Sequence, residues 1–127
     1  MDAFLDADIL ISIYNGRPQA VSWLQINSKL TLGITPVAWM EVLRGGQNKV
    51  AQQRLTQYLA HYPVIDLTNT DQNWAMRQYQ TYKLSHGVGI LDCLIAAPCY
   101  RLQIPLYTRN LKHMTPLLGA LAVQPYL

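Results

Sequence analysis

Short apolar segments alternate along this chain with longer segments of helical periodicity, and this alternation constrains the fold more than any other feature of the sequence. Five apolar segments predict short, buried strands: residues 3–5, 30–34, 64–65, 105–108 and 121–123. Helical spacing and helix-start signals predict helices over residues 9–14, 18–26, 36–43, 50–62, 69–82 and 90–102. Strands that alternate with helices predict a mostly parallel sheet of four to five short strands, joined by right-handed crossovers and covered by helices on both faces. The expected class is therefore α/β, in three layers.

The size and composition of the chain predict a single compact domain over residues 1–127. Half of the 127 residues are hydrophobic and only 13% are charged, against roughly a quarter in an average globular protein. This balance excludes a charged disordered tail and a solvated helical rod. No apolar run reaches the roughly 18 to 20 residues that cross a bilayer, and the acidic start, Met1–Asp6, lacks the basic residues of a signal peptide. A cytoplasmic protein without a membrane partner is expected.

The net charge of +3 lies entirely in the carboxyl-terminal part of the chain. Seven acidic and seven basic residues balance over residues 1–92, and no acid follows Asp92. The remaining bases are Arg101, Arg109 and Lys112. A basic segment of this kind attracts a phosphate backbone, although three charges alone are also compatible with an ordinary solvated surface.

Four of the acids are predicted to converge at one edge of the sheet. Asp6 and Asp8 directly follow the first strand. Glu41 lies in the second turn of the helix after the second strand, and Asp92 lies in the first turn of the helix after the glycine loop 87–89. Because the carboxyl ends of parallel strands meet at the same edge of a sheet, we expect these four side chains to lie close together.

Such a group of carboxylates points to a divalent cation. Like charges within a few ångströms repel, and Mg²⁺ or Mn²⁺, which prefer oxygen ligands, relieve that repulsion. A metal of this kind activates water and neutralises charge on a phosphodiester. Thr108 and Asn110 leave a later strand at the same edge, beside the basic segment. The combination predicts metal-assisted cleavage of nucleic acid.

Each acid taken alone also has an ordinary structural interpretation. Asp8 and Asp92 fit first-turn acids that the helix dipole favours. Glu41 can pair with Arg44, three residues further along the same helix. Asp6 is different, because no local need for a carboxylate is evident after a buried strand. The joint placement of the four, rather than any one of them, indicates a site.

The cysteines and histidines do not predict a metal site of their own. Cys93 and Cys99 are six residues apart, which is not the spacing of a zinc-binding pair, so free buried thiols are expected. His86, in the glycine loop, and His113, beside Lys112, are expected to be structural or surface residues.

Four segments, in this order, resemble the motifs of PIN-domain ribonucleases, especially the VapC toxins of bacterial toxin–antitoxin pairs. They are residues 4–11, 35–45, 85–97 and 105–114. The resemblance spans nearly the whole chain. It implies a Mg²⁺-dependent endoribonuclease on a three-layer α/β/α fold, inhibited by a cognate antitoxin protein.

The resemblance also implies roles for individual residues. Asp6, Glu41 and Asp92 match the core metal-binding acids of the family. Asp8 stands where relatives have Asn or Asp, and Thr108 matches a hydroxyl residue near the metal. Asn110 matches a position that is often acidic, so the fourth carboxylate of many relatives is absent here, which puts a second metal site in doubt.

Together these observations lead to one hypothesis of function and two alternatives. The hypothesis is a toxin that hydrolyses RNA with metal-activated water, forms a homodimer and is bound by its antitoxin. Thr108 and Asn110 would orient the water or the phosphate. Four bases would hold the RNA backbone: Arg109, Lys112, Arg44 and Arg101. The alternatives are a non-catalytic PIN-like module that binds RNA or protein, and a phosphatase whose nucleophile is the first acid of the pair Asp6 and Asp8. The lack of any acid after Asp92 argues against the phosphatase.

Overall fold

Four short parallel strands form the centre of the molecule. The structure is a computed structural model that describes residues 1–127. The strands are β1 (Ala3–Leu5), β2 (Leu32–Gly33), β3 (Leu106–Tyr107) and β4 (Ala122–Val123), in the order β2-β1-β3-β4. Phe4, in β1, pairs with Gly33 on one side and with Leu106 on the other. The predicted parallel sheet of four to five short strands is thus confirmed, with four.

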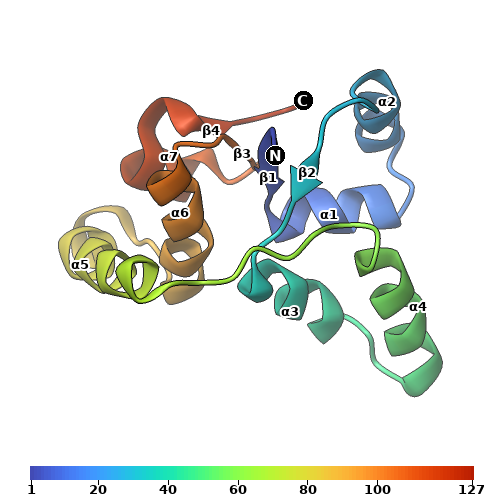
Figure 1. The fold of residues 1–127 in the computed structure, drawn as a ribbon, viewed down its shortest axis with the longest axis horizontal. Helices are drawn as coiled ribbons and strands as arrows, with labels where there is room; N and C mark the ends of the chain where they lie inside the picture. The colour runs from blue at the N-terminus through green and yellow to red at the C-terminus, as the bar shows by residue number, and fades with distance from the viewer.

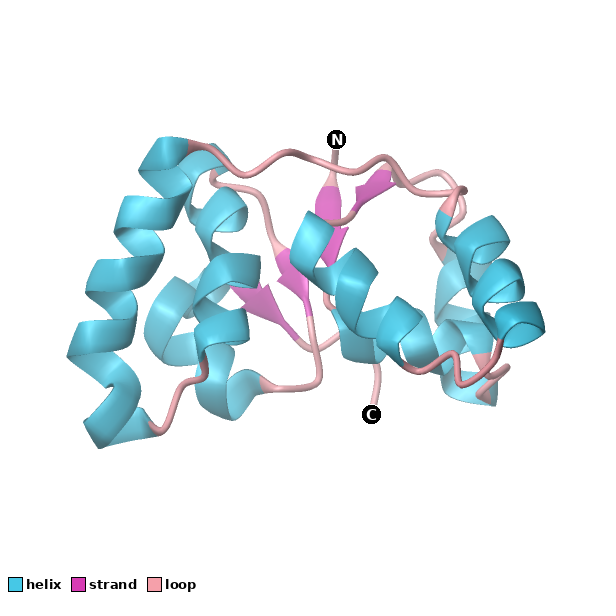
Figure 2. Cartoon of the chain, turned by 90° about the horizontal axis from the view of Figure 1, so that it is seen from below, coloured by secondary structure: helices cyan, strands magenta, loops and turns pink.

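Helices cover both faces of this sheet. They are α1 (Ala7–Tyr14), α2 (Pro18–Ile26), α3 (Pro36–Arg44), α4 (Lys49–Leu59), α5 (Asn69–His86), α6 (Ile90–Leu102) and α7 (Leu111–Leu118), with a 3₁₀ turn, η1 (Gly119–Leu121), before β4. Figures 1 and 2 show α5, α6 and α7 on one side of the strands and the first four helices on the other. Within these layers α5 packs on α6 and α6 on α7, while α3 packs on α1 and α4. The predicted three-layer α/β/α arrangement is confirmed.

Local capping residues explain where two of the helices begin. The Thr35 hydroxyl accepts a hydrogen bond from the Ala38 N–H at 3.1 Å, and proline follows at the first helical position of α3. At the start of α5, Thr68 and Asp71 exchange side-chain and backbone hydrogen bonds in a capping box. Both helix starts are those that the sequence predicts.

Two elements differ from the sequence prediction, whereas α6 has the bounds that the sequence predicts. Residues 64–65 make only an isolated bridge between Val64 and Ile34, not a strand. Helix α7 has no counterpart among the predicted helices. Helix α6 continues across Pro98, although a proline inside a helix removes one backbone hydrogen bond.

The core packs against the sheet and holds its carboxyl edge in place. Phe4 and Leu5 of β1 are fully buried, as are Ile9 and Leu10 of α1, which follows directly. Cys93 and Cys99 are free thiols buried in α6, as the sequence predicts. None of the helices combines the length and the apolar character that crossing a bilayer requires.

Candidate functional site

Asp6 and Thr108 occupy the carboxyl ends of the two central strands. Asp6 is the N-cap of α1, and its Oδ1 accepts a hydrogen bond of 2.7 Å from the Ala7 N–H. Its Oδ2 accepts a bond of 2.8 Å from the Thr108 hydroxyl, which in turn accepts the Asn110 N–H at 3.0 Å. Asp6 is only 7% exposed and Thr108 is fully buried. Asp6 therefore caps α1, a structural role that the sequence did not reveal. The two hydrogen bonds hold its carboxylate in one orientation.

Asp8 lies one residue into α1 and has one oxygen without a protein partner. Its Oδ2 accepts a hydrogen bond of 3.0 Å from the Arg109 N–H, which ties α1 to the segment after β3. Its Oδ1 is buried and makes no hydrogen bond. Because a buried, unpaired polar atom costs free energy, this oxygen is the clearest position in the site for an additional electropositive group.

Glu41 and Asp92 approach from the early turns of two other helices. Glu41 lies in the second turn of α3 and is partly exposed. Asp92 lies in the first turn of α6, where its Oδ2 accepts a hydrogen bond of 2.9 Å from the N–H of the N-cap residue, Gly89. Asp92 therefore has the ordinary structural role of a first-turn acid. Its charge also acts on Glu41.

The four carboxylates are close enough for their charges to interact. Burial and the charge of Asp8, with a smaller contribution from Glu41, raise the pKa of Asp6 to about 7, against the hydrogen bond from Thr108. Burial raises the pKa of Glu41, and the charges of Asp92 and Asp8 raise it further, while Arg44 opposes them. Burial likewise raises the pKa of Asp8, against hydrogen bonds from the backbone. We call Asp6, Asp8, Glu41 and Asp92 the acidic cluster.

The acidic cluster suits a hard cation by its chemistry, although it is not a closed cage. All of its ligand atoms are carboxylate oxygens, the donors that Mg²⁺ and Mn²⁺ prefer. Burial and repulsion between the carboxylates raise the pKa of Asp6 and of Glu41, and a bound cation would offset both effects. No three His, Cys, Asp or Glu side chains stand in a ready-made coordination group. Mg²⁺ commonly keeps several of its waters and takes few carboxylates, which fits an open arrangement.

Comparison with known proteins assigns the family. The sequence matches the PIN domain family over residues 3–113, most of the chain. The chain belongs to the PIN domain family. No curated protein sequence is significantly similar to it.

Solved structures share the fold of this PIN domain. It is similar to a chain of a toxin–antitoxin complex from Klebsiella pneumoniae, with 26% identity, a TM-score of 0.80 and 98% of each chain covered. It is also similar to a chain of VapBC2 from Rickettsia felis bound to promoter DNA, with 20% identity, a TM-score of 0.72 and 94% of each chain covered. A DNA-bound VapBC from Salmonella typhimurium matches with 20% identity, a TM-score of 0.69 and coverage of 89% of this chain and 90% of that one.

The four basic residues that were predicted to hold RNA divide into two groups by position. Arg109 and Lys112 are exposed in the segment after β3, and Arg44 is exposed near Glu41, whose pKa it lowers. Arg101 is engaged elsewhere: its guanidinium donates two hydrogen bonds, of 2.8 and 3.1 Å, to Asp71 at the start of α5. Because Arg101 lies in the last turn of α6 and Asp92 in the first, the structure does not bring Arg101 to the acidic cluster.

One residue of the PIN domain that sequence reasoning set aside touches the acidic cluster. His113 Nδ1 lies 3.1 Å from Asp92 Oδ2 and 3.2 Å from Asn110 Nδ2. His113 is therefore not a lone surface histidine. The only sequence signal was its spacing from Asn110, three residues earlier, which places both at the start of a helix that was not predicted.

Proposed function

We propose that this PIN domain is a Mg²⁺- or Mn²⁺-dependent endoribonuclease that works in the cytoplasm as the toxin of a toxin–antitoxin pair. The observation that carries the proposal is the acidic cluster: carboxylates from three separate segments lie at the carboxyl edge of the sheet, where the charge of Asp8 raises the pKa of both Asp6 and Glu41. The toxin role rests on the similarity to chains of toxin–antitoxin complexes. Membership of the PIN family argues against the phosphatase alternative.

The acidic cluster would hold the cation directly or through its waters. Asp8 Oδ1, Asp92 Oδ1 and the carboxylate of Glu41 accept no hydrogen bond from the protein, so they are the most available ligands. When bound, the metal supplies an activated water and positive charge beside the phosphodiester. Without the cation, burial and the charge of Asp8 raise the pKa of Asp6 to about 7, and a bound cation would lower it again and keep this carboxylate ionised.

Neighbouring residues would orient the reaction. The Thr108 hydroxyl holds Asp6 in one orientation, and the Asn110 N–H holds that hydroxyl. Arg109, Lys112 and Arg44 are exposed around the acidic cluster, where their positive charge would attract the phosphates of RNA. Arg101 is outside this set, because it is bound to Asp71.

RNA cleavage by the purified chain tests the proposal. The parent protein, freed of antitoxin and contaminating nuclease, is expected to cut single-stranded RNA with Mg²⁺ or Mn²⁺ and to stop when EDTA is added. Asp6→Asn and Asp92→Asn should abolish cleavage. Asp66→Asn is the matched control, because Asp66 is exposed and has no hydrogen bond or ion pair. If the two cluster variants cut as fast as the control, the nuclease proposal is wrong.

A non-catalytic PIN domain that binds RNA or protein is the second candidate. It is favoured by the lack of a ready-made metal group and by the hydrogen bonds that already engage both oxygens of Asp6. Calorimetric titration with Mn²⁺ separates the two candidates. The nuclease is expected to bind the ion, and a non-catalytic module is expected to bind it negligibly even where RNA still binds.

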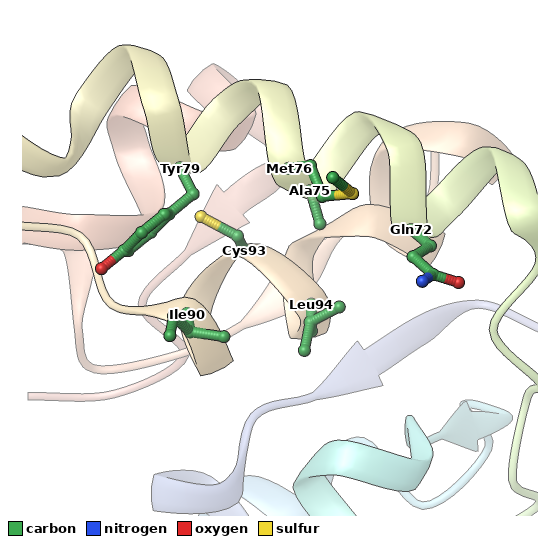
Figure 3. A pocket seen from close by; sticks show the side chains of 7 residues that line it. All are labelled: Gln72, Ala75, Met76, Tyr79, Ile90, Cys93 and Leu94. Atoms are coloured by element: carbon green, nitrogen blue, oxygen red, sulfur yellow. The ribbon is translucent and has the colours of Figure 1, made fainter.

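We further propose that two copies of the chain associate through an apolar surface on α5 and α6. A cavity of about 320 Å³ opens there between the two helices (Figure 3). Its lining is Gln72, Ala75, Met76, Tyr79, Ile90, Cys93 and Leu94. Met76 and Ile90 are 65% and 58% exposed and line the same apolar cavity, so together they form a contiguous apolar surface that a second copy would cover. A second apolar pocket, between α3 and α6, shares Leu94 and reaches Glu41, so this surface borders the acidic cluster.

An antitoxin protein is the other proposed partner. The support is the similarity to chains whose printed descriptions are toxin–antitoxin complexes. If a small reading frame lies next to the gene, co-expression of the chain with its product, followed by co-purification, tests this partner. Cleavage of RNA should be lost in the complex and recovered after the partner is removed.

A further inference from the structure

Tyr126, in the segment that follows β4, packs against helix α2. Residues 124–127 run from β4 back toward α2 (Figure 1). There the ring of Tyr126 lies against the ring of Trp23, with the two centroids 6.5 Å apart. Trp23 in turn packs edge-on against Tyr107 of β3, with the centroids 4.9 Å apart. The ring of Tyr126 is therefore part of an aromatic group that joins the last segment to α2 and to the sheet.

The guanidinium of Arg109 lies over the ring of Tyr126. Its Cζ is 5.9 Å from the ring centroid, a distance at which the face of an aromatic ring attracts a cation. The backbone of the same residue is also fixed, because the Arg109 N–H donates a hydrogen bond of 3.0 Å to Asp8 Oδ2. Arg109 is therefore held at both ends, at its backbone by the acidic cluster and at its guanidinium by Tyr126.

The contact with Tyr126 leaves the charge of Arg109 available. Burial raises the pKa of Asp8, and the backbone N–H and the charge of Arg109 both oppose that rise, so the guanidinium acts on the acidic cluster. It nevertheless forms no ion pair, whereas Arg101 is bound to Asp71. An aromatic face attracts a guanidinium without neutralising its charge, and it leaves the N–H donors that point away from the ring free. Arg109 thus keeps the capacity to bind a phosphate that Arg101 has lost.

The ring of Tyr126, rather than its hydroxyl, makes these contacts. The hydroxyl oxygen is buried and has no hydrogen-bond partner. The side chain is therefore held by its aromatic contacts with Trp23 and Arg109. A phenylalanine at this position would keep both contacts.

We propose that Tyr126 is a positioning residue for Arg109, and that its ring holds the guanidinium beside the acidic cluster to bind a phosphate of the RNA backbone. A long side chain that is already restrained loses less conformational freedom when it binds, which raises affinity. What this inference says of RNA rests on the proposed function. What it says of the contact between Tyr126 and Arg109 does not, because that contact is a property of the chain alone.

A double-mutant cycle on RNA affinity, measured in EDTA, tests whether Tyr126 acts through Arg109. Tyr126→Leu removes the ring, so it should weaken the binding of single-stranded RNA about two- to fivefold, the worth of an exposed cation–π contact. Tyr126→Phe keeps the ring and should bind RNA like the parent. In a protein that already carries Arg109→Ala, Tyr126→Leu should cause no further loss. An equal loss with and without Arg109 overturns the proposal.

Tyr100→Leu is the matched control for the loss of an aromatic contact. Tyr100 is 47% exposed in the last turn of α6, and its ring stacks on Trp74 with the centroids 4.9 Å apart. The substitution therefore removes a ring contact away from Arg109, and RNA affinity should remain that of the parent. If Tyr100→Leu weakens RNA binding as much as Tyr126→Leu does, the proposed role of Tyr126 is wrong.

The side-chain proton resonances of Arg109 report on the contact without RNA. Protons over the face of an aromatic ring are shifted upfield, so the resonances of Arg109 should lie upfield of those of a solvated arginine in the parent and in Tyr126→Phe. They should return to ordinary positions in Tyr126→Leu. Ordinary positions in the folded parent overturn the proposal even where Tyr126→Leu does not fold. If the parent binds no RNA, the proposed function fails together with the RNA part of this inference, and the resonances still decide whether Tyr126 holds Arg109.

Discussion

The Thr108 hydroxyl donates a hydrogen bond of 2.8 Å to Asp6 Oδ2 and so joins the ends of the two central strands across 102 positions of sequence. Both groups are buried, and the same hydroxyl accepts the Asn110 N–H. One small side chain therefore satisfies one carboxylate oxygen, Asp6 Oδ2, and one backbone donor, the Asn110 N–H, that would otherwise lack partners.

Replacing Thr108 with valine should destabilise the protein by about 1–3 kcal/mol, the usual cost of leaving a buried polar group unpaired. Valine keeps the shape of threonine but lacks the hydroxyl that lowers the pKa of Asp6, so that pKa should rise further. Urea unfolding of the metal-free protein measures the change. Thr108→Ser, which keeps the hydroxyl, is the control, and equal losses in the two variants would show that packing rather than the hydrogen bond matters.

The raised pKa of Asp6 predicts how the stability of the metal-free protein depends on pH. The carboxyl ionises at about 3.8 in the unfolded chain and at about 7 in the folded one. Between these values the folded state binds more protons, so this contribution to the free energy of unfolding is complete below pH 4, falls as the pH rises, and is lost above 7. Asp8 and Glu41, whose pKa values are also raised, act in the same direction.

Asp6→Asn should therefore flatten the pH dependence between about pH 4 and 7 and stabilise the metal-free protein at pH 8. Thermal unfolding at a series of pH values checks this, with Asp66→Asn as the control that should behave like the parent. Saturating Mg²⁺ should stabilise the parent at pH 8, because an ion that binds only the folded state shifts the equilibrium toward it. If the stability of Asp6→Asn depended on pH in the same way as that of the parent, Asp6 would have to be ionised over the whole pH range tested.

Local signals made the fold and the acidic cluster predictable. The starts of α3 and α5 depend on Thr35 and Thr68, whose capping bonds reach only three residues along the chain. The convergence of the four acids follows from topology, because each lies just after a strand or in an early turn of a helix at the same edge. No knowledge of side-chain packing was needed for either inference.

The features that were not predicted are short elements and contacts between residues that lie far apart in the sequence. Helix α7 has only eight residues and contains Pro116, so its apolar spacing is weak against the helix-breaking signal of a proline. Residues 64–65 read as a strand, but only one bridge to Ile34 forms. The partners of Arg101 and His113 are 30 and 21 positions away in sequence, and no spacing rule reveals such contacts.

Arg101 and Arg109 should respond differently to replacement by alanine. Arg101→Ala leaves Oδ1 of the buried Asp71 without a partner, so it should destabilise the protein by about 1–3 kcal/mol and leave RNA affinity unchanged. Arg109→Ala keeps the backbone N–H that binds Asp8, so the fold should persist. RNA should then bind more weakly, and the dependence of log affinity on log salt should become shallower by about 0.7. Fluorescence anisotropy at several salt concentrations, in EDTA, measures both.

The opposite result for the two arginine variants would place the RNA-binding surface elsewhere on the protein. If Arg101→Ala weakened RNA binding and changed the salt dependence while Arg109→Ala did neither, the RNA would have to run along the far end of α6 rather than beside the acidic cluster. Lys112→Ala offers an independent check, because Lys112 is exposed in the first turn of α7 and should behave like Arg109.

The apolar surface on α5 and α6 predicts the oligomeric state. Met76→Glu and Ile90→Glu each place a charge on a large, exposed apolar position beside the cavity, so burying that position against a second copy becomes unfavourable. Sedimentation velocity at micromolar concentration should show a dimer for the parent and a monomer for both variants. Ile26→Glu is the matched control, since Ile26 is 83% exposed on α2, on the other side of the sheet, and its variant should remain dimeric. A monomeric parent would show that no dimer forms. If Ile26→Glu dissociated while the other two variants did not, the dimer contact would lie on α2 instead.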